Sequence, residues 1–170
     1  MNKMRLFLTL TGYQLTWLSC VFGESKFNLP FLGIIVGTTF IVLYFYFSKN
    51  KFNFLKISLR IFIPGYIFDT LMVYFAIYEF NSSMMFGTLP TWMLTLWISF
   101  STLFDEILCI FKKYKYTGIF LSGLLGPITY YLGKPIGIIS INHEVLFILL
   151  MVIFWVSLMI YYISYVLKKN

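Results

Sequence analysis

The chain alternates between long apolar runs and short polar, mostly basic stretches, and this alternation predicts its elements. Each apolar run has 17–24 residues, which meets the length of about 20 residues that a helix needs to cross about 30 Å of hydrocarbon. The six runs are Leu6–Phe22, Leu29–Phe47, Ile57–Phe80, Thr91–Phe111, Tyr116–Leu132 and Val145–Leu167. We therefore predict an all-α integral membrane protein, a six-transmembrane-helix bundle that forms a single domain over residues 1–170.

The composition agrees with a membrane protein. Hydrophobic residues make up 60% of the chain and charged residues 11%, whereas soluble domains have about 45–50% apolar and about 25% charged residues. The mean hydropathy is +0.86. The stretches between the runs are too short to form a soluble domain, so we expect the bilayer itself to be the main partner.

The basic residues predict the topology. A net charge of +7 would suggest nucleic-acid binding in a soluble protein, but here the basic residues lie in short clusters beside the apolar runs. With the N-terminus in the cytoplasm, the basic residues on that side are Lys3, Arg5, Lys49, Lys51, Lys56, Arg60, Lys112, Lys113, Lys115, Lys168 and Lys169. Only Lys26 and Lys134 fall on the other side. This asymmetry predicts that both ends face the cytoplasm, and it argues against nucleic acid as a partner.

The fourth run carries a polar stripe within an apolar helix. Thr95, Ser99, Thr102 and Glu106 follow one another at steps of four, three and four residues, which places them on one helical face. Asp105 lies beside Glu106. Polar groups in a membrane helix face the bundle interior and pair there, so the stripe needs partners from other helices.

Asp69 in the third run is an acid that lies near the predicted midplane, counting 1.5 Å of rise per residue. It can stay protonated and donate to Gln14 or to a carbonyl, or it can ionise opposite a cation. Arg60 can extend to the inner interface or meet Glu106 on the fourth helix. The residues that we expect in one polar layer between the inner leaflet and the midplane are Gln14, Asp69, Thr102, Asp105, Glu106 and Tyr130. Interhelical hydrogen bonding and a functional site both remain open interpretations of this layer.

Prolines and glycines predict irregularities in the helices. Pro64 removes a backbone donor and clashes with the preceding turn, so we expect a kink there. Pro64, Gly126 and Pro127 are therefore our predicted helix breaks. The stretch 133–144 reads as a loop or a short re-entrant segment. In the second run, Gly33 and Gly37 form a GxxxG motif, which either lets two helices approach closely or reflects the frequency of glycine in membrane helices.

The sequence contains no motif that identifies a catalytic or metal centre. Cys20 and Cys109 do not form a CxxC pair, and His143-Glu144 lacks the second histidine of the HExxH motif. We find no P-loop and no GxSxG nucleophile motif. We expect no metal and no cofactor, and the motifs leave catalysis open while favouring a non-catalytic protein.

Several short motifs appear together, in order, in a known family. They comprise Tyr13, Gln14 and Trp17; Asp69; Pro90, Trp92, Leu96, Trp97, Thr102 and Leu103; and Gly126, Pro127, Tyr130, Gly133 and Gly137. Over nearly its whole length the chain resembles an uncharacterised bacterial inner-membrane family, domain of unknown function 2878. Members often have Asn-His directly after the Thr-Leu pair, whereas Phe104 and Asp105 stand there in this chain, so a role for that histidine does not carry over. The resemblance implies a multi-pass location in a bacterial inner membrane. It also implies a lipid or envelope context, because genes of the family often neighbour lipid-modifying enzymes such as cyclopropane-synthase-like methyltransferases.

Three functions fit these observations. The first is a non-catalytic, lipid- or envelope-associated membrane module, with another membrane protein or a lipid-modifying enzyme as a further candidate partner. The second is a small proton- or cation-coupled carrier centred on Asp69, in which a break in the fifth helix exposes carbonyls. The third is an intramembrane lipid-modifying enzyme that uses Asp69, Asp105 or Glu106 as acid or base together with Tyr130. The first explains the small size and the short loops.

Overall fold

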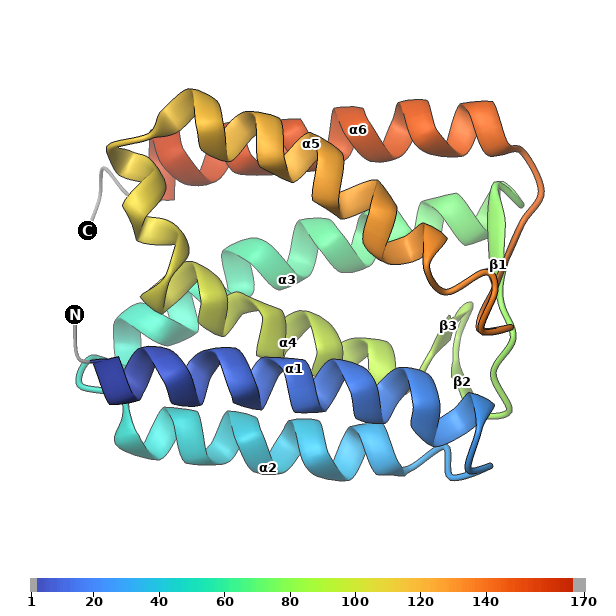
Figure 1. Ribbon diagram of the computed structural model, residues 1–170, viewed down its shortest axis with the longest axis horizontal. Helices are drawn as coiled ribbons and strands as arrows, with labels where there is room; N and C mark the ends of the chain where they lie inside the picture. The colour runs from blue at the N-terminus through green and yellow to red at the C-terminus, as the bar shows by residue number, and fades with distance from the viewer. Residues whose placement is uncertain (1–2, 167–170) are drawn as a thin grey trace.

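Six α-helices form one bundle in the computed structural model, which describes residues 3–166 (Figure 1). The helices are α1 (Lys3–Ser25), α2 (Leu32–Phe47), α3 (Lys51–Tyr74), α4 (Trp92–Glu106), α5 (Lys115–Tyr131) and α6 (Glu144–Tyr161). A 3-10 turn, Leu108–Lys112, follows α4, and a π-helical turn, Tyr162–Val166, follows α6. The chain enters and leaves the bundle at the same end, which carries Arg5 and Val166 and which we call the terminal end (Figure 1).

Two small antiparallel ribbons close the opposite end, which we call the strand end (Figure 1). β1 (Tyr78–Phe80) pairs with β4 (Ile139–Ile141), and β2 (Met85–Phe86) pairs with β3 (Leu89–Pro90). Of the two alternatives for the stretch 133–144, the structure therefore has the loop, which consists of a turn that leads into β4. Beside β4, the Lys134 ammonium donates to the Glu144 carboxylate, and this hydrogen bond raises the pKa of Lys134.

The helix boundaries differ from the predicted ones mainly in α3. This helix begins at Lys51 rather than at Ile57, because the Asn50 side chain accepts a hydrogen bond of 3.0 Å from the Asn53 backbone and caps it. It ends at Tyr74, and Ala76 then adopts a φ of 52° before β1 begins. The predicted end of the last run, residue 167, lies outside the described residues.

The expectation of six equally long membrane spans is only partly met. Within residues 3–166, three helices are long and apolar enough to cross a membrane: Arg5–Ser25, Lys51–Tyr74 and Glu144–Val166. α2 is apolar but has 16 residues, while α4 has 15 and α5 has 17. The fourth run falls short because its last turns form the 3-10 segment that leads across to α5. The all-helical class fits the structure, with the two short ribbons as an addition.

The bundle consists of two groups of helices. α1, α2, α3 and α4 pack together, and α5 packs on α6 (Figure 1). Within the first group, α1 and α2 approach closely at the two glycines of the GxxxG motif. A Cβ atom at Gly33 would lie 2.7 Å from the Cα of Cys20, and one at Gly37 would lie 2.9 Å from the Cγ2 of Thr16. Of the two interpretations of this motif, the structure therefore supports the close approach of two helices.

Aromatic rings join the two groups. Trp97 of α4 stacks on Trp155 of α6 with ring centroids 5.8 Å apart and an interplanar angle of 17°. Phe68 of α3 stacks on Phe154 of α6 with centroids 3.9 Å apart. Large rigid rings at this junction fill the space between α4 and α6, so the groups meet through side chains rather than through close backbone contact.

Candidate functional site

Asp69 lies in the interior of α3, where its side chain is completely buried. Its carboxylate accepts three side-chain donors from three other elements. The hydroxyl of Tyr78 in β1 donates to Oδ1 at 2.6 Å, and the indole Nε1 of Trp97 in α4 donates to Oδ2 at 2.7 Å. The hydroxyl of Tyr130 in α5 lies 2.8 Å and 2.9 Å from the two oxygens. Asp69 therefore links α3 to β1, α4 and α5.

All three partners of Asp69 are donors, which suits an acid that accepts hydrogen bonds. A phenol or an indole that is buried needs an acceptor, and a carboxylate has enough lone pairs for three of them. The cost of an acid within a membrane protein is usually offset by such partners. Since every oxygen is engaged and the side chain is shielded, this geometry stabilises the fold and offers no open position at Asp69.

The predicted polar layer divides into separate groups. Tyr130 lies against Asp69. Gln14 does not lie against Asp69, because its side chain is exposed. Within the described residues the Asp69 carboxylate accepts from Tyr78, Trp97 and Tyr130 instead. Thr102 is buried, but its hydroxyl donates to the backbone oxygen of Ser99 at 2.7 Å within the same helix. The expected contact between Asp69 and Gln14 is therefore not formed, because aromatic donors occupy the carboxylate.

The polar stripe on α4 faces inward, but toward α1 and α2 rather than toward Asp69. Thr95 lies next to Gly37 of α2, and Ser99 is completely buried. Trp97, on a different face of α4, is the residue that reaches Asp69. The hydroxyls of Thr95 and Ser99 donate to backbone oxygens three residues earlier, at 2.8 Å each. The stripe thus satisfies its own donors and needs fewer partners than its sequence suggested.

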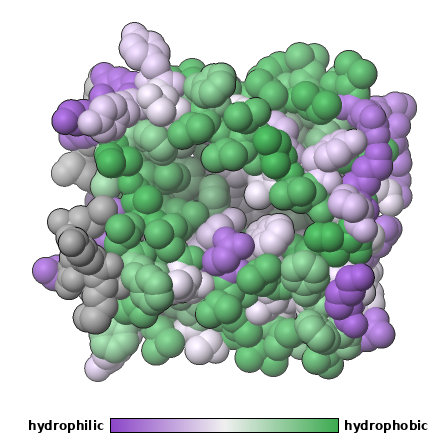
Figure 2. All heavy atoms as spheres, viewed as in Figure 1, coloured by the Kyte–Doolittle hydropathy of each residue, from purple (hydrophilic) through white to green (hydrophobic). Residues whose placement is uncertain are grey.

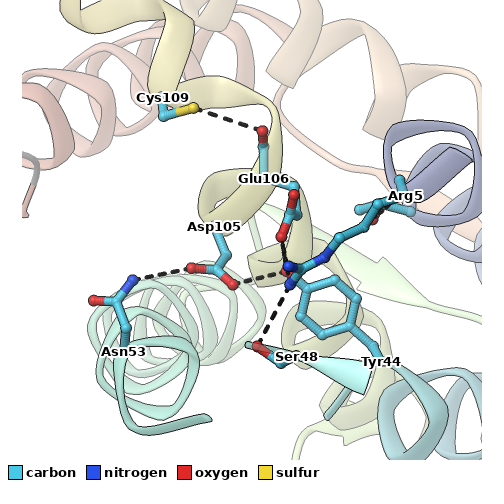
Figure 3. A network of polar contacts seen from close by, with 8 residues as sticks. Arg5, Tyr44, Ser48, Asn53, Asp105, Glu106 and Cys109 are labelled. Carbon is cyan, nitrogen blue, oxygen red and sulfur yellow. Dashed lines mark hydrogen bonds and ion pairs between the residues drawn. The ribbon is translucent and has the colours of Figure 1, made fainter. Parts of the chain in front are cut away.

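The other two acids lie in a second network at the terminal end (Figure 3). The guanidinium of Arg5 in α1 pairs with Glu106 at 2.5 Å. Asp105 accepts from the Tyr44 hydroxyl at 2.7 Å and from the Asn53 amide at 3.1 Å. This network connects α1, α2, α3 and α4, and the partner of Glu106 is Arg5 rather than Arg60.

Neither α3 nor α5 is interrupted at the predicted breaks, while the kink near Pro64 stays a prediction. α3 continues through Pro64 and α5 continues through Gly126 and Pro127. Proline removes one hydrogen bond, but the flanking turns keep theirs. Gly126 has a packing role instead, because a Cβ there would lie 2.2 Å from the Cγ of Trp155. α5 therefore exposes no broken backbone that could bind a cation in the way the carrier hypothesis requires.

A feature that the sequence did not reveal is an apolar cleft between the two helix groups. It has a volume of about 360 Å³ and runs between α1 and α4 on one side and α5 and α6 on the other. Figure 2 shows apolar side chains around a hollow on the side of the bundle. The side chains that line it include Tyr13, Trp17, Trp92, Trp97, Leu125, Tyr130 and Trp155.

The cleft and the Asp69 network share two residues, because Trp97 and Tyr130 both hold the carboxylate and line the cleft. Trp155 lines the cleft as well, with 8% of its surface exposed. Its indole Nε1 is buried and has no hydrogen-bond partner within residues 3–166. A groove with an apolar wall and few polar groups has the character of a site for an apolar or amphipathic ligand.

Comparison with known proteins places the chain in a family without adding a function. The family model described as "Protein of unknown function (DUF2878)" matches residues 6–161. No curated protein and no solved structure matches the chain.

Proposed function

We propose that this chain, which belongs to DUF2878, a family of unknown function, is a multi-pass membrane protein. We further propose that it holds a lipid acyl chain in the cleft. We propose that all six helices lie in the membrane, although α2, α4 and α5 are short. The exposed surface of the bundle is rich in large apolar side chains, as on Leu8, Ile35 and Ile67. Such a surface suits hydrocarbon rather than water.

We propose that the terminal end faces the cytoplasm. The basic residues of this end include Arg5, Lys49, Lys51 and Lys56, whereas Glu24, Glu79 and Glu144 lie at the strand end with Lys26 and Lys134. This distribution agrees with the positive-inside rule. A location in a bacterial inner membrane rests on the family resemblance and is part of the same proposal.

The single observation that carries the lipid proposal is the cleft itself. Its volume of about 360 Å³ falls in the range of ligand-binding pockets, about 300–1,000 Å³. It opens on the side of the bundle, which faces acyl chains if the helices cross the membrane (Figure 2). A hydrocarbon chain would cover a wall that is largely apolar and in which Trp97 and Tyr130 already donate to Asp69. The Nε1 of Trp155, which has no partner within residues 3–166, is already buried.

The same observations favour this function over the two alternatives. A carrier centred on Asp69 needs a carboxylate that its cargo can reach, but Asp69 is completely buried and holds three donors. An enzyme needs a free acid or base in the cleft, but Asp105 and Glu106 are engaged at the terminal end by Arg5, Tyr44 and Asn53. Neither acid lines the cleft.

Tryptophan fluorescence gives a direct test, because all 4 tryptophans of the chain line the cleft. The protein is reconstituted in vesicles of phosphatidylcholine that carries bromine in the middle of its acyl chains. Contact with bromine quenches tryptophan. We expect stronger quenching in wild type than in Thr129→Phe, whose larger ring fills the cleft from α5.

Ile128→Phe is the matched control, since Ile128 is 42% exposed on the same helix and does not line the cleft. It should leave the quenching unchanged. Equal quenching in Thr129→Phe, Ile128→Phe and wild type would mean that the bromine acts from the surrounding bilayer alone, and the proposed function would then be wrong.

A further inference from the structure

A second groove lies between α3 and α6 and shares no residue with the cleft. Its volume is about 540 Å³. Three side chains bring polar donors to it: Arg60 from α3, and Ser157 and Tyr161 from α6. Ser157 and Tyr161 are four residues apart, so they lie one above the other on the same face of α6. The remaining wall is apolar and consists of Leu59, Ile63, Pro64, Phe154 and Leu158.

Arg60 is a cation in this apolar setting, and within residues 3–166 it forms no ion pair and no hydrogen bond. The acid that the sequence offered, Glu106, pairs with Arg5. Asp105 is held by Tyr44 and Asn53. A guanidinium stays charged at every pH that proteins meet, so burial in a bilayer does not neutralise it. It needs an anion, and this part of the chain supplies none.

The hydroxyls of Ser157 and Tyr161 likewise lack hydrogen-bond partners within residues 3–166. Neither donates a hydrogen bond within the described residues, although both line the groove. A fork of guanidinium donors beside two hydroxyl donors matches the several acceptor oxygens of a phosphate. The apolar remainder of the groove matches hydrocarbon.

We propose that this groove binds an anionic phospholipid, with the phosphate on Arg60, Ser157 and Tyr161 and an acyl chain along Ile63 and Phe154. The lipid source follows from the wall: a free phosphate ion would leave the apolar part of the groove empty. The position agrees, because Tyr161 is the last residue of α6, at the terminal end, where basic residues attract anionic lipids. This site goes beyond the proposed function, since it recognises a headgroup and lies apart from the cleft.

The test is the thermal unfolding of the purified protein in a zwitterionic detergent during titration with lipid. A ligand that binds only the folded state raises the unfolding temperature as its concentration rises. We expect phosphatidylglycerol to do so for wild type and phosphatidylcholine with the same acyl chains to do so much less. Arg60→Gln should weaken the apparent affinity for phosphatidylglycerol by about tenfold or more, as expected for the loss of charged hydrogen bonds.

Lys56→Gln is the matched control, because it removes the same charge one turn earlier on α3, where Lys56 lies over the ring of Phe52 at 4.2 Å. It should retain the affinity to within about twofold, since the screened contribution of a surface charge is small. Equal weakening by both variants would overturn the proposal in favour of diffuse attraction to the basic end.

Three further outcomes would also overturn it: an equal effect of phosphatidylcholine on wild type, full affinity in Arg60→Gln, or the same stabilisation by inorganic phosphate without lipid. If Arg60→Gln does not fold, the double variant Ser157→Ala, Tyr161→Phe replaces it. That variant keeps the charge and removes both hydroxyls, and it should also bind phosphatidylglycerol more weakly than wild type. Unchanged affinity in the double variant would count against the phosphate site in the same way.

Discussion

Replacing Asp69 with alanine should destabilise the protein far more than removing the hydroxyl of either tyrosine that donates to it. Asp69→Ala leaves three buried donors without an acceptor: the hydroxyls of Tyr78 and Tyr130 and the Nε1 of Trp97. An unsatisfied buried donor costs about 1–3 kcal/mol, so three of them cost about 3–9 kcal/mol. A domain has a total stability of about 5–15 kcal/mol, so we expect Asp69→Ala to yield little folded protein.

Asp69→Asn is the more informative change. It keeps the volume and one acceptor oxygen. It replaces the other carboxylate oxygen with an amide NH2, which cannot accept a hydrogen bond from the donor that faces it. We expect a loss of about 1–3 kcal/mol, the cost of one unsatisfied donor. Tyr130→Phe and Tyr78→Phe should each cost about 1.5–3 kcal/mol, because each removes a hydrogen bond to a charged group. Combined with Asp69→Asn, either change should cost less than the sum of the two.

The assay is reversible unfolding in mixed detergent micelles, followed by circular dichroism and by tryptophan fluorescence. Tyr66→Phe is the control. Like the other two tyrosine changes it removes a hydroxyl group, and Tyr66 lies on the same helix as Asp69, but its hydroxyl does not donate to the acid. Its effect should stay within about 0.5 kcal/mol of wild type, because the ring of Tyr66 is only partly buried and stays in place in the variant. Wild-type stability of Asp69→Asn, or strictly additive losses when it is combined with Tyr130→Phe, would show that Asp69 is not the acceptor that stabilises these donors.

Two further changes test other contacts by the same unfolding assay. Gly126→Ala should destabilise the protein by about 1–3 kcal/mol, because the new Cβ would lie 2.2 Å from the Cγ of Trp155. Gly123→Ala should cost less, since its Cβ would meet side-chain methyl groups, Val156 Cγ2 at 2.9 Å and Val152 Cγ1 at 3.7 Å, instead of a ring at 2.2 Å; an equal cost would contradict this reason. Arg5→Gln should cost about 1 kcal/mol, because its pair with Glu106 is partly exposed. Adding Glu106→Gln to Arg5→Gln should cost little more, and a fully additive second loss would show that the pair does not interact.

The helices were predictable because apolar length is a local property of the sequence. All six predicted runs contain a helix, in the expected order. Their ends were less predictable, because they depend on neighbours far along the chain. Tyr78 and Ile141 pair across a ribbon although more than sixty residues separate them. The pattern of apolar runs does not predict this pairing. The 3-10 turn after α4 likewise interrupts a run whose composition would let a helix continue.

The polar residues of the site were found, but their partners were not. Asp69 and Tyr130 both stood out as polar groups in apolar runs, whereas Trp97 and Tyr78 did not, because their rings count as hydrophobic. A signal existed nonetheless. A buried tryptophan or tyrosine seeks an acceptor for its N–H or O–H, so a lone acid in an aromatic-rich chain predicts aromatic donors around it. Arg5 was missed because a basic residue near a terminus is already explained by topology.

An acid inside a membrane protein usually marks the functional site, but the contacts here assign it a different task. Tyr130 reaches from α5 to Asp69 and lines the cleft with the same side chain, so its hydrogen bond fixes where α5 stands relative to α3. Trp97 does the same for α4. Variants of Asp69 should therefore lower lipid binding only as far as they loosen the fold, whereas Thr129→Phe should lower binding in a protein that unfolds like wild type. That separation between stability and binding is what distinguishes an acid that shapes the cleft from one that acts within it.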